Sequence, residues 1–189
     1  MLTAPAFSPA EAVLGPADTI TLSGGQISLT SDITIPGTGA DLLIVQNTAA
    51  LSGTSRVFLV PTGAAKTVQL RGLTMTGGNC TDTGAGLLIE GSSNATGSLI
   101  ACAISGNTST IYGGGIGHYS GTLSVINSTI SGNTATGAFG GGGIDSFGGT
   151  ALTVINSTLS GNSNTFSNSS NGGAIFARSE EHTSELQSR

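Results

Sequence analysis

Hydrophobic and polar residues alternate along much of the chain with a period of two, which is the pattern of β-strands. In the segment that begins at Leu123, apolar residues such as Leu123 and Val125 alternate with small polar ones, and β-branched residues dominate. No stripe of apolar residues at helical spacing is present. Clusters of glycine, asparagine and serine follow each segment and indicate turns. The pattern predicts an all-β protein of short strands.

The pattern also repeats. Residues 123–144 are nearly restated by residues 152–175, and a weaker copy spans residues 97–116. An asparagine in each Ser-Gly-Asn segment, with one in a degenerate Thr-Gly-Gly-Asn segment, recurs every 26–29 residues, at Asn79, Asn107, Asn133 and Asn162. The apolar residue after each glycine-rich segment recurs every 28–31 residues, at Leu87, Ile116, Ile144 and Ile175. A period of this kind, which absorbs small insertions, is typical of a solenoid.

The repeat predicts a right-handed parallel β-helix, a single-stranded solenoid of the pectate-lyase-like kind with about five to six coils. Less regular coils are expected upstream, with strands within residues 18–22, 27–35, 41–47, 56–60 and 67–75. The expected segments are an irregular, truncated start in residues 1–17, irregular coils in 18–71, regular coils in 72–177, and a tail in 178–189.

Inward side chains of such a solenoid form columns along its axis. We expect Ile130 to stack between Ile104 and Leu159. The glycine runs 113–115 and 140–143 are expected to supply positive φ angles at one corner of the coil.

The recurrent asparagines are predicted to form hydrogen bonds with backbone groups that are left unpaired at the turns. An inward asparagine side chain can bond backbone groups of its own coil and of the next coil. This reasoning predicts a ladder of Asn107, Asn133 and Asn162. It also predicts a second stacked pair, Asn127 and Asn156.

The glycine-rich segments resemble a known repeat. Residues 172–175 read GGAI, one half of the repeat of polymorphic outer membrane proteins, and GGGI before Ile116 and Ile144 is its variant. The other half, FxxN in that family, has isoleucine or leucine here, at Ile104, Ile130 and Leu159. The resemblance extends to bacterial surface proteins of choice-of-anchor and autotransporter type. It implies secretion or a place at the cell surface, and a β-helical passenger for adhesion or display that contacts polysaccharide or host and cell-surface molecules.

The composition argues against two classes of partner, nucleic acids and membranes. Only 8% of the residues are charged, the formal net charge is −5, and tryptophan is absent, so a nucleic-acid interface is not expected. No stretch approaches the roughly 18 continuous apolar residues of a membrane-spanning helix, so membrane insertion of this segment is not expected. Cys80 and Cys102 fall at different positions of the repeat, which argues against a disulfide between them.

Ionisable residues are sparse in the regular coils. We expect Asp82 and Asp145 in turns at different corners and Glu90 on a strand, so that no two share a register. A lyase needs a strong base and a hydrolase needs paired carboxylates. We therefore expect no catalytic residue and no cofactor. The alternatives are a piece of a polysaccharide-active β-helix enzyme whose catalytic coils lie elsewhere, and a structural spacer in a large surface protein.

Two motifs suggest binding sites. GGGGIDSFG, residues 140–148, matches the calcium-binding nonapeptide with Asp145 as a ligand. Such a site needs an oxygen ligand from successive turns, whereas the repeat places Gly117 and Phe176 beside Asp145. We therefore expect an exposed aspartate at a glycine corner and no metal. His118, expected to be exposed, forms a possible sugar-contacting pair with Tyr119.

The chain changes character at its end. Residues 72–177 contain no lysine or arginine, whereas residues 178–189, RSEEHTSELQSR, are rich in charge. Residues 178–188 resemble the translation of a common short-read sequencing adapter. The resemblance predicts an artefactual tail that takes no part in the fold.

Deleting residues 178–189 is expected to leave the Tm unchanged within error, because a charged segment poor in apolar residues cannot bury the apolar end of a solenoid. Calorimetric melting of both forms measures the effect. A fall of several degrees would show that these residues are a genuine cap.

Overall fold

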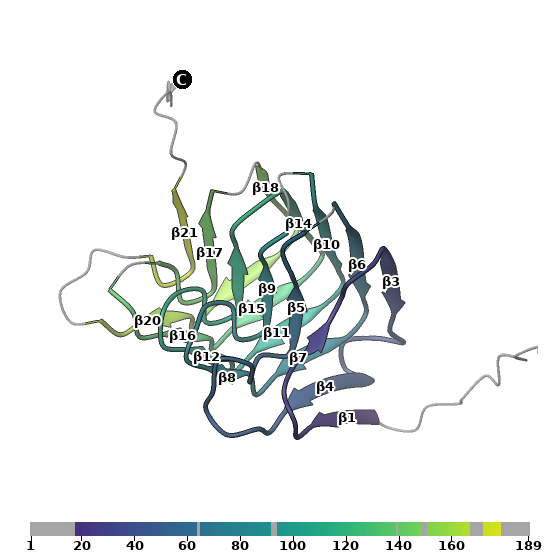
Figure 1. The fold of residues 1–189 in the computed structure, drawn as a ribbon, viewed down its shortest axis with the longest axis horizontal. Coiled ribbons are helices and arrows are strands. Elements are labelled where there is room, and N and C mark those ends of the chain that lie inside the picture. Colours follow the sequence, from purple (N-terminus) through teal and green to yellow (C-terminus); the bar gives the residue numbers. More distant parts are fainter. Residues whose placement is uncertain are drawn as a thin grey trace, which may run out of the picture.

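The computed structural model describes residues 18–63, 65–91, 94–138, 140–148, 151–166 and 172–178. These residues form 21 β-strands and contain no helix. All strand pairs are parallel and belong to four sheets that run along the molecule, as the sequence predicts. Figure 1 shows the strands of each sheet stacked in chain order, from purple at β1 to yellow at β21.

Each sheet takes one strand from successive coils. The β1 sheet contains β1 (Asp18–Leu22), β4 (Leu43–Asn47), β7 (Thr74–Thr76), β11 (Ala103–Ser105), β15 (Thr129–Ser131) and β19 (Thr158–Ser160). The β3 sheet contains β3 (Ile33–Pro36), β6 (Thr67–Arg71), β10 (Thr96–Ile100), β14 (Thr122–Ile126) and β18 (Ala151–Ile155). The β8 sheet contains β8 (Asn79–Cys80), β12 (Thr108–Ser109), β16 (Thr134–Ala135) and β20 (Ser163–Asn164).

The fourth sheet carries the site described below. This β2 sheet contains β2 (Ile27–Ser28), β5 (Phe58–Val60), β9 (Leu87–Ile89), β13 (Ile116–His118), β17 (Ile144–Phe147) and β21 (Ile175–Arg178). A regular coil passes through the β3, β1, β8 and β2 sheets in turn, and the molecule has about five such turns. The fold is therefore a parallel β-helix.

Apolar columns form the core of the solenoid. Ile104 pairs with Ile130, and Ile130 pairs with Leu159, which confirms the predicted stack. The apolar position that recurs after each glycine-rich segment is confirmed too, because its residues occupy one register of the β2 sheet: Leu87, Ile116, Ile144 and Ile175. Side chains of the middle coils are fully buried, whereas Leu159 and Ile175 in the last coil are only partly buried.

The predicted asparagine ladder is present at the turn between the β1 and β8 sheets. Nδ2 of Asn107 donates to Oδ1 of Asn133 at 3.0 Å, and Nδ2 of Asn133 donates to Oδ1 of Asn162 at 2.9 Å. Each accepting Oδ1 also receives the backbone N–H of the preceding asparagine, at 3.1 Å in both cases. Nδ2 of Asn133 donates further to the carbonyl of Ile104 at 2.9 Å. The Asn133 side chain thus satisfies two backbone groups of the preceding coil and also bonds the amide oxygen of the next ladder asparagine.

The ladder begins at Asn107, as predicted, and Asn79, which the repeat aligns with Asn107, lies outside the register of the ladder. Asn79 pairs with Thr108 in the β8 sheet, so it lies one residue beyond the ladder register. Gly78 holds the equivalent position, and its N–H donates to Oδ1 of Asn107 at 2.9 Å. The degenerate Thr-Gly-Gly-Asn segment therefore contributes a backbone donor in place of a side chain.

Asn127 and Asn156 occupy equivalent positions of neighbouring coils, as the predicted stack requires, but they are exposed, unlike the asparagines of the ladder. They follow β14 and β18, and both residues have positive φ, 50° and 47°. Gly72 and Ala101 hold the same corner in earlier coils with φ of 55° and 51°. Asparagine suits this corner because it tolerates the left-handed conformation better than most residues.

A second ladder, which the sequence analysis missed, lies one residue further along. The hydroxyl of Ser157 accepts the N–H of Ser128 at 3.1 Å, and the hydroxyl of Ser128 accepts the N–H of Cys102 at 3.1 Å. Cys102 continues this column with a buried thiol whose Sγ lies 3.4 Å from the carbonyl oxygen of Leu70. Cys80 is a buried free thiol in the β8 sheet. The two cysteines thus lie in different columns.

The glycine runs serve two purposes, of which the sequence analysis recognised one. Gly113 and Gly140 have positive φ, 57° and 106°, as predicted. Gly114 and Gly142 are instead required by close approach, because a Cβ atom there would lie 2.4 Å and 2.2 Å from backbone oxygens of the β8 sheet.

One residue of the predicted tail, Arg178, belongs to the fold. Arg178 is the last residue of β21 and pairs with Phe147. Residues 179–189 lie outside the described residues.

Replacing Asn133 with leucine is expected to lower the free energy of unfolding by about 1–3 kcal/mol, because it leaves the Ile104 carbonyl and the Asn107 N–H unpaired inside the solenoid. Urea denaturation measures the loss. The matched control, Asn127→Gly, alters an exposed corner asparagine and should change stability by only a few tenths of a kcal/mol. Equal losses in both variants would contradict the ladder's structural role.

Candidate functional site

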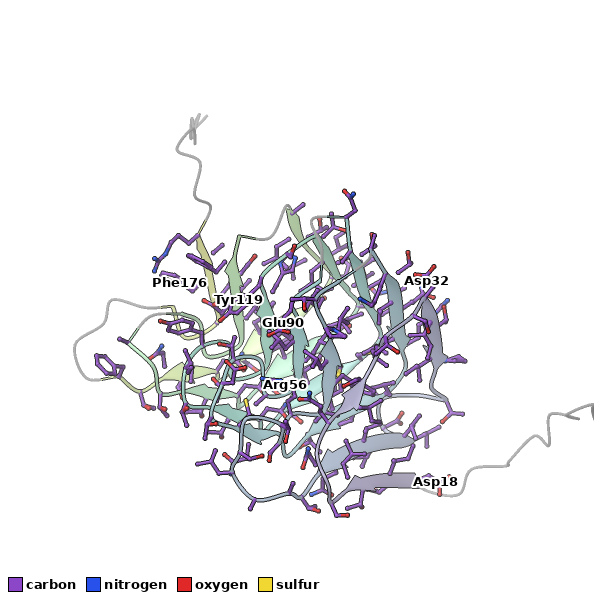
Figure 2. All side chains as sticks on the ribbon, viewed as in Figure 1. Asp18, Asp32, Arg56, Glu90, Tyr119 and Phe176 are labelled. Carbon is purple, nitrogen blue, oxygen red and sulfur yellow. The ribbon has the colours of Figure 1, made fainter. Side chains whose placement is uncertain are left out.

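The outer face of the β2 sheet presents two columns of side chains near the C-terminal end of the solenoid. Ile116 and Ile144 point inward, so their sequence neighbours point outward. One outward column runs through Gly117, Asp145 and Phe176. Phe147 and Arg178 pair in the second column, which Tyr119 continues on the other side of Phe147. Figure 2 shows Tyr119 and Phe176 at this end of the molecule.

These columns border a groove of about 650 Å³. The size lies within the range of small-ligand sites. Both tyrosines of the chain and two of its six phenylalanines line the groove. The full lining is Tyr112, Tyr119, Asp145, Phe147, Gly148, Phe176 and Arg178. Half of the aromatic residues of the chain therefore gather at one place.

Tyr119 is held in position on two sides. Its ring meets that of Phe147 edge to face, with centroids 6.3 Å apart and an interplanar angle of 79°. Its hydroxyl lies 2.6 Å from the hydroxyl of Thr83, a residue of the loop before β9. Burial raises the pKa of Tyr119 to about 12. The side chain is thus a neutral, fixed wall at any ordinary pH.

Gly117 makes room for this arrangement. A Cβ atom at Gly117 would lie 2.5 Å from Cγ2 of Thr83 and 2.9 Å from Cδ1 of Leu88. The loop that holds Thr83 thus packs against the outer face of β13 at the position where a side chain is missing. This loop buries Leu88 fully although that residue lies in the outward column.

Asp145 is buried, which contradicts the predicted exposed corner. It lies on β17 with 2% of its surface exposed, because the glycine run that precedes β17 folds against it. Its Oδ2 atom has no hydrogen-bond partner among the described residues. Burial raises the pKa of Asp145 to about 6, while Arg178 and a backbone hydrogen bond from Gly141 act in the opposite direction.

The register beside Asp145 is the one predicted. Gly117 and Phe176 pair with it on either side, so neighbouring coils offer it no carboxylate. Within the described ranges, no three histidine, cysteine, aspartate or glutamate residues gather closely enough to hold a metal ion. Three residues of the nonapeptide match, Asp145, Phe147 and Gly148, line the groove.

Arg178 provides a cation at the mouth of the groove. Its guanidinium carbon lies 5.3 Å from the ring centroid of Phe147 and 5.4 Å from that of Phe176. Both distances are in the range of cation–π contacts. Sequence reasoning missed this contact because it assigned Arg178 to the tail.

His118 is buried inside the solenoid and does not form an exposed pair with Tyr119. None of its surface is exposed. Nε2 lies 3.1 Å from the carbonyl of Gly121, and Nδ1 lies 3.0 Å from the hydroxyl of Ser146. A carbonyl only accepts, so Nε2 donates and Nδ1 of the neutral ring accepts from Ser146. Burial lowers the pKa of His118, which favours this neutral form.

The signal for this orientation was available in the sequence. His118 lies two residues after Ile116, which was correctly expected to point inward, and residues two apart on a strand share a face. By the same rule Tyr119 points outward. The histidine therefore belongs to the core and the tyrosine to the groove.

Asp82 and Glu90, the other acids of the regular coils, lie before and after β9 of the same sheet. Asp82, in the loop before β9, forms an ion pair of 2.7 Å with the buried guanidinium of Arg56. Asp145 lies on β17 and not in a turn as predicted, whereas Asp82 lies in the loop before β9. Glu90 directly follows β9 and so lies just outside a strand, not on one as predicted. In Figure 2 Arg56, Glu90, Tyr119 and Phe176 follow one another toward the C-terminal end.

Comparison with protein-family models, with curated proteins and with solved structures found no match to this chain. Within the described residues, no helix has the length and apolar character needed to cross a membrane.

Replacing Asp145 with asparagine should change stability in a pH-dependent way. The folded-state pKa, about 6, lies above the ordinary value of 3.8, so folding disfavours the ionised carboxyl. That cost is fully present above about pH 6 and disappears as the pH falls toward about 4. Relative to the wild type, the variant should therefore be more stable near pH 8 than near pH 4, by on the order of 2 kcal/mol. Denaturation of both proteins at both pH values measures this. A difference in unfolding free energy that does not change with pH would contradict the raised pKa of the buried Asp145 carboxyl.

Proposed function

We propose that this chain is a non-catalytic part of an exported bacterial surface protein, and that its β-helix presents a glycan-binding groove for adhesion. The clustering of Tyr112, Tyr119, Phe147 and Phe176 around one groove carries the proposal. Pyranose rings have flat apolar C–H faces, and aromatic rings offer matching surfaces. The resemblance of the glycine-rich repeats to bacterial surface proteins supports the location.

The rigidity of the groove favours binding. Two neighbouring strands of one sheet, β17 and β21, carry four of the seven lining residues, and Tyr119 directly follows the next strand, β13. Tyr119 is fixed by Thr83 and Phe147, so little side-chain freedom is lost when a ligand enters. A polysaccharide could run along the sheet, since the groove opens on the outer face of the solenoid.

The chemistry of the groove argues against the enzyme alternative. The phenol of Tyr119, with a pKa of about 12 and a hydrogen bond to Thr83, is a poor base at neutral pH. Among the described lining residues, Asp145 contributes the one carboxyl group, whereas glycoside hydrolysis uses a pair. The inward His118 has no path to a ligand in the groove.

Tyr119→Ala and Phe147→Ala are each expected to weaken glycan binding by about tenfold, because each removes one stacking surface. Affinity electrophoresis and calorimetry on a panel of polysaccharides, including pectin and alginate, would measure binding, with product analysis on the same samples. Ile155→Ala, which truncates a 47%-exposed apolar residue on the β3 sheet, is the matched control and should bind like the wild type.

Two results would overturn the proposal. Release of unsaturated uronic acids or new reducing ends, with or without calcium, would favour the enzyme alternative. A failure to bind any glycan would leave the structural spacer as the better description.

A further inference from the structure

The groove combines a carboxyl group with a cation supplied by its own chain. Asp145 lines it with Oδ2 unpartnered among the described residues, although the side chain is almost completely buried. The guanidinium of Arg178 lies over Phe147 and Phe176, close enough to lower the pKa of Asp145. The site thus already accommodates one organic cation.

Three features of the groove favour a positively charged group over a neutral one. The faces of aromatic rings carry negative potential, which attracts cations. The unpartnered oxygen of Asp145 is a hydrogen-bond acceptor, and a charged donor repays its burial better than a neutral one. The chain as a whole has a formal net charge of −5, which attracts cationic ligands toward it.

The aromatic walls in turn favour a ligand in which the positively charged group is attached to a sugar. Tyr119 and Phe147 meet at 79°, so the two rings offer differently oriented surfaces for a bulky, angular ligand. The volume of about 650 Å³ exceeds what a single ammonium group fills and suits a sugar ring with its substituents.

We propose that the groove binds a cationic glycan, one built from amino sugars with free ammonium groups, whose rings pack on Tyr119, Phe147 and Phe176 while an ammonium group approaches the carboxyl of Asp145. The guanidinium of Arg178 occupies the place of that ammonium group and must leave when the ligand enters. This inference rests on the proposed glycan-binding function and specifies the glycan.

The test uses the full chain and three hexasaccharides at neutral pH, measured by calorimetry. The ligands are the glucosamine hexamer, its N-trimethylated form, whose charge does not depend on pH, and the neutral N-acetylglucosamine hexamer. The two cationic hexamers are expected to bind at least about tenfold more tightly than the acetylated one. The preference should fall as salt is added.

Two variants locate the preference in the groove. Asp145→Asn should reduce it to about twofold or less, because the variant weakens binding of the two cationic hexamers more than binding of the acetylated one. Arg178→Ala should raise the affinity for both cationic hexamers several-fold, because it removes the competing guanidinium. Ile155→Ala should match the wild type with all three ligands, and melting curves confirm that each variant is folded.

The outcomes separate this inference from the function on which it rests. Equal or tighter binding of the acetylated hexamer would overturn the charge preference and leave the glycan groove standing. A preference that survives Asp145→Asn and is unaffected by Arg178→Ala would also overturn it, since the net charge of the chain would then be its cause. Binding of no hexamer at all would count against the groove itself.

Discussion

The structure depends on one constraint, which is that every polar backbone group inside the solenoid must find a partner in the neighbouring coil. Strands meet this requirement by parallel pairing, but a turn that faces inward cannot. Asn107, Asn133 and Asn162 meet it there with their amide groups, and Ser128 and Ser157 meet it at the turn between the β3 and β1 sheets. These bonds fix the register between coils, and the register in turn places Asp145 between Gly117 and Phe176.

The sequence was sufficient for the architecture because a solenoid repeats its physical requirements. The repeat has an apolar residue at one recurring position, and this predicts a column of stacked side chains. The structure contains that column, formed by Ile104, Ile130 and Leu159. The alignment of the repeat failed at Asn79, which lies one residue beyond the register of the ladder, so that Gly78 holds the ladder position. A period alone cannot distinguish an inserted residue from a substituted one.

The site was harder to predict, because its properties arise from loops that fold over a sheet. Alternation along β13 could have turned His118 inward and Tyr119 outward. By contrast, nothing in the local sequence of Asp145 shows that its carboxyl is covered, or that Arg178 lies beside the rings of neighbouring coils. The groove is a product of residues 28–31 positions apart, brought together by the winding of the chain.

The asparagine ladder also gives the solenoid a direction. Every Oδ1 in it accepts from the coil before, and the Nδ2 atoms of Asn107 and Asn133 donate to the coil after. The amide dipoles are therefore aligned head to tail along the axis, and such a row polarises each of its members. The two ends of the ladder are consequently inequivalent electrically: the coil before Asn107 meets an amide acceptor, whereas a coil after Asn162 would meet an amide donor. A further coil can therefore extend the ladder in register only if its asparagine amide points in the same direction along the axis.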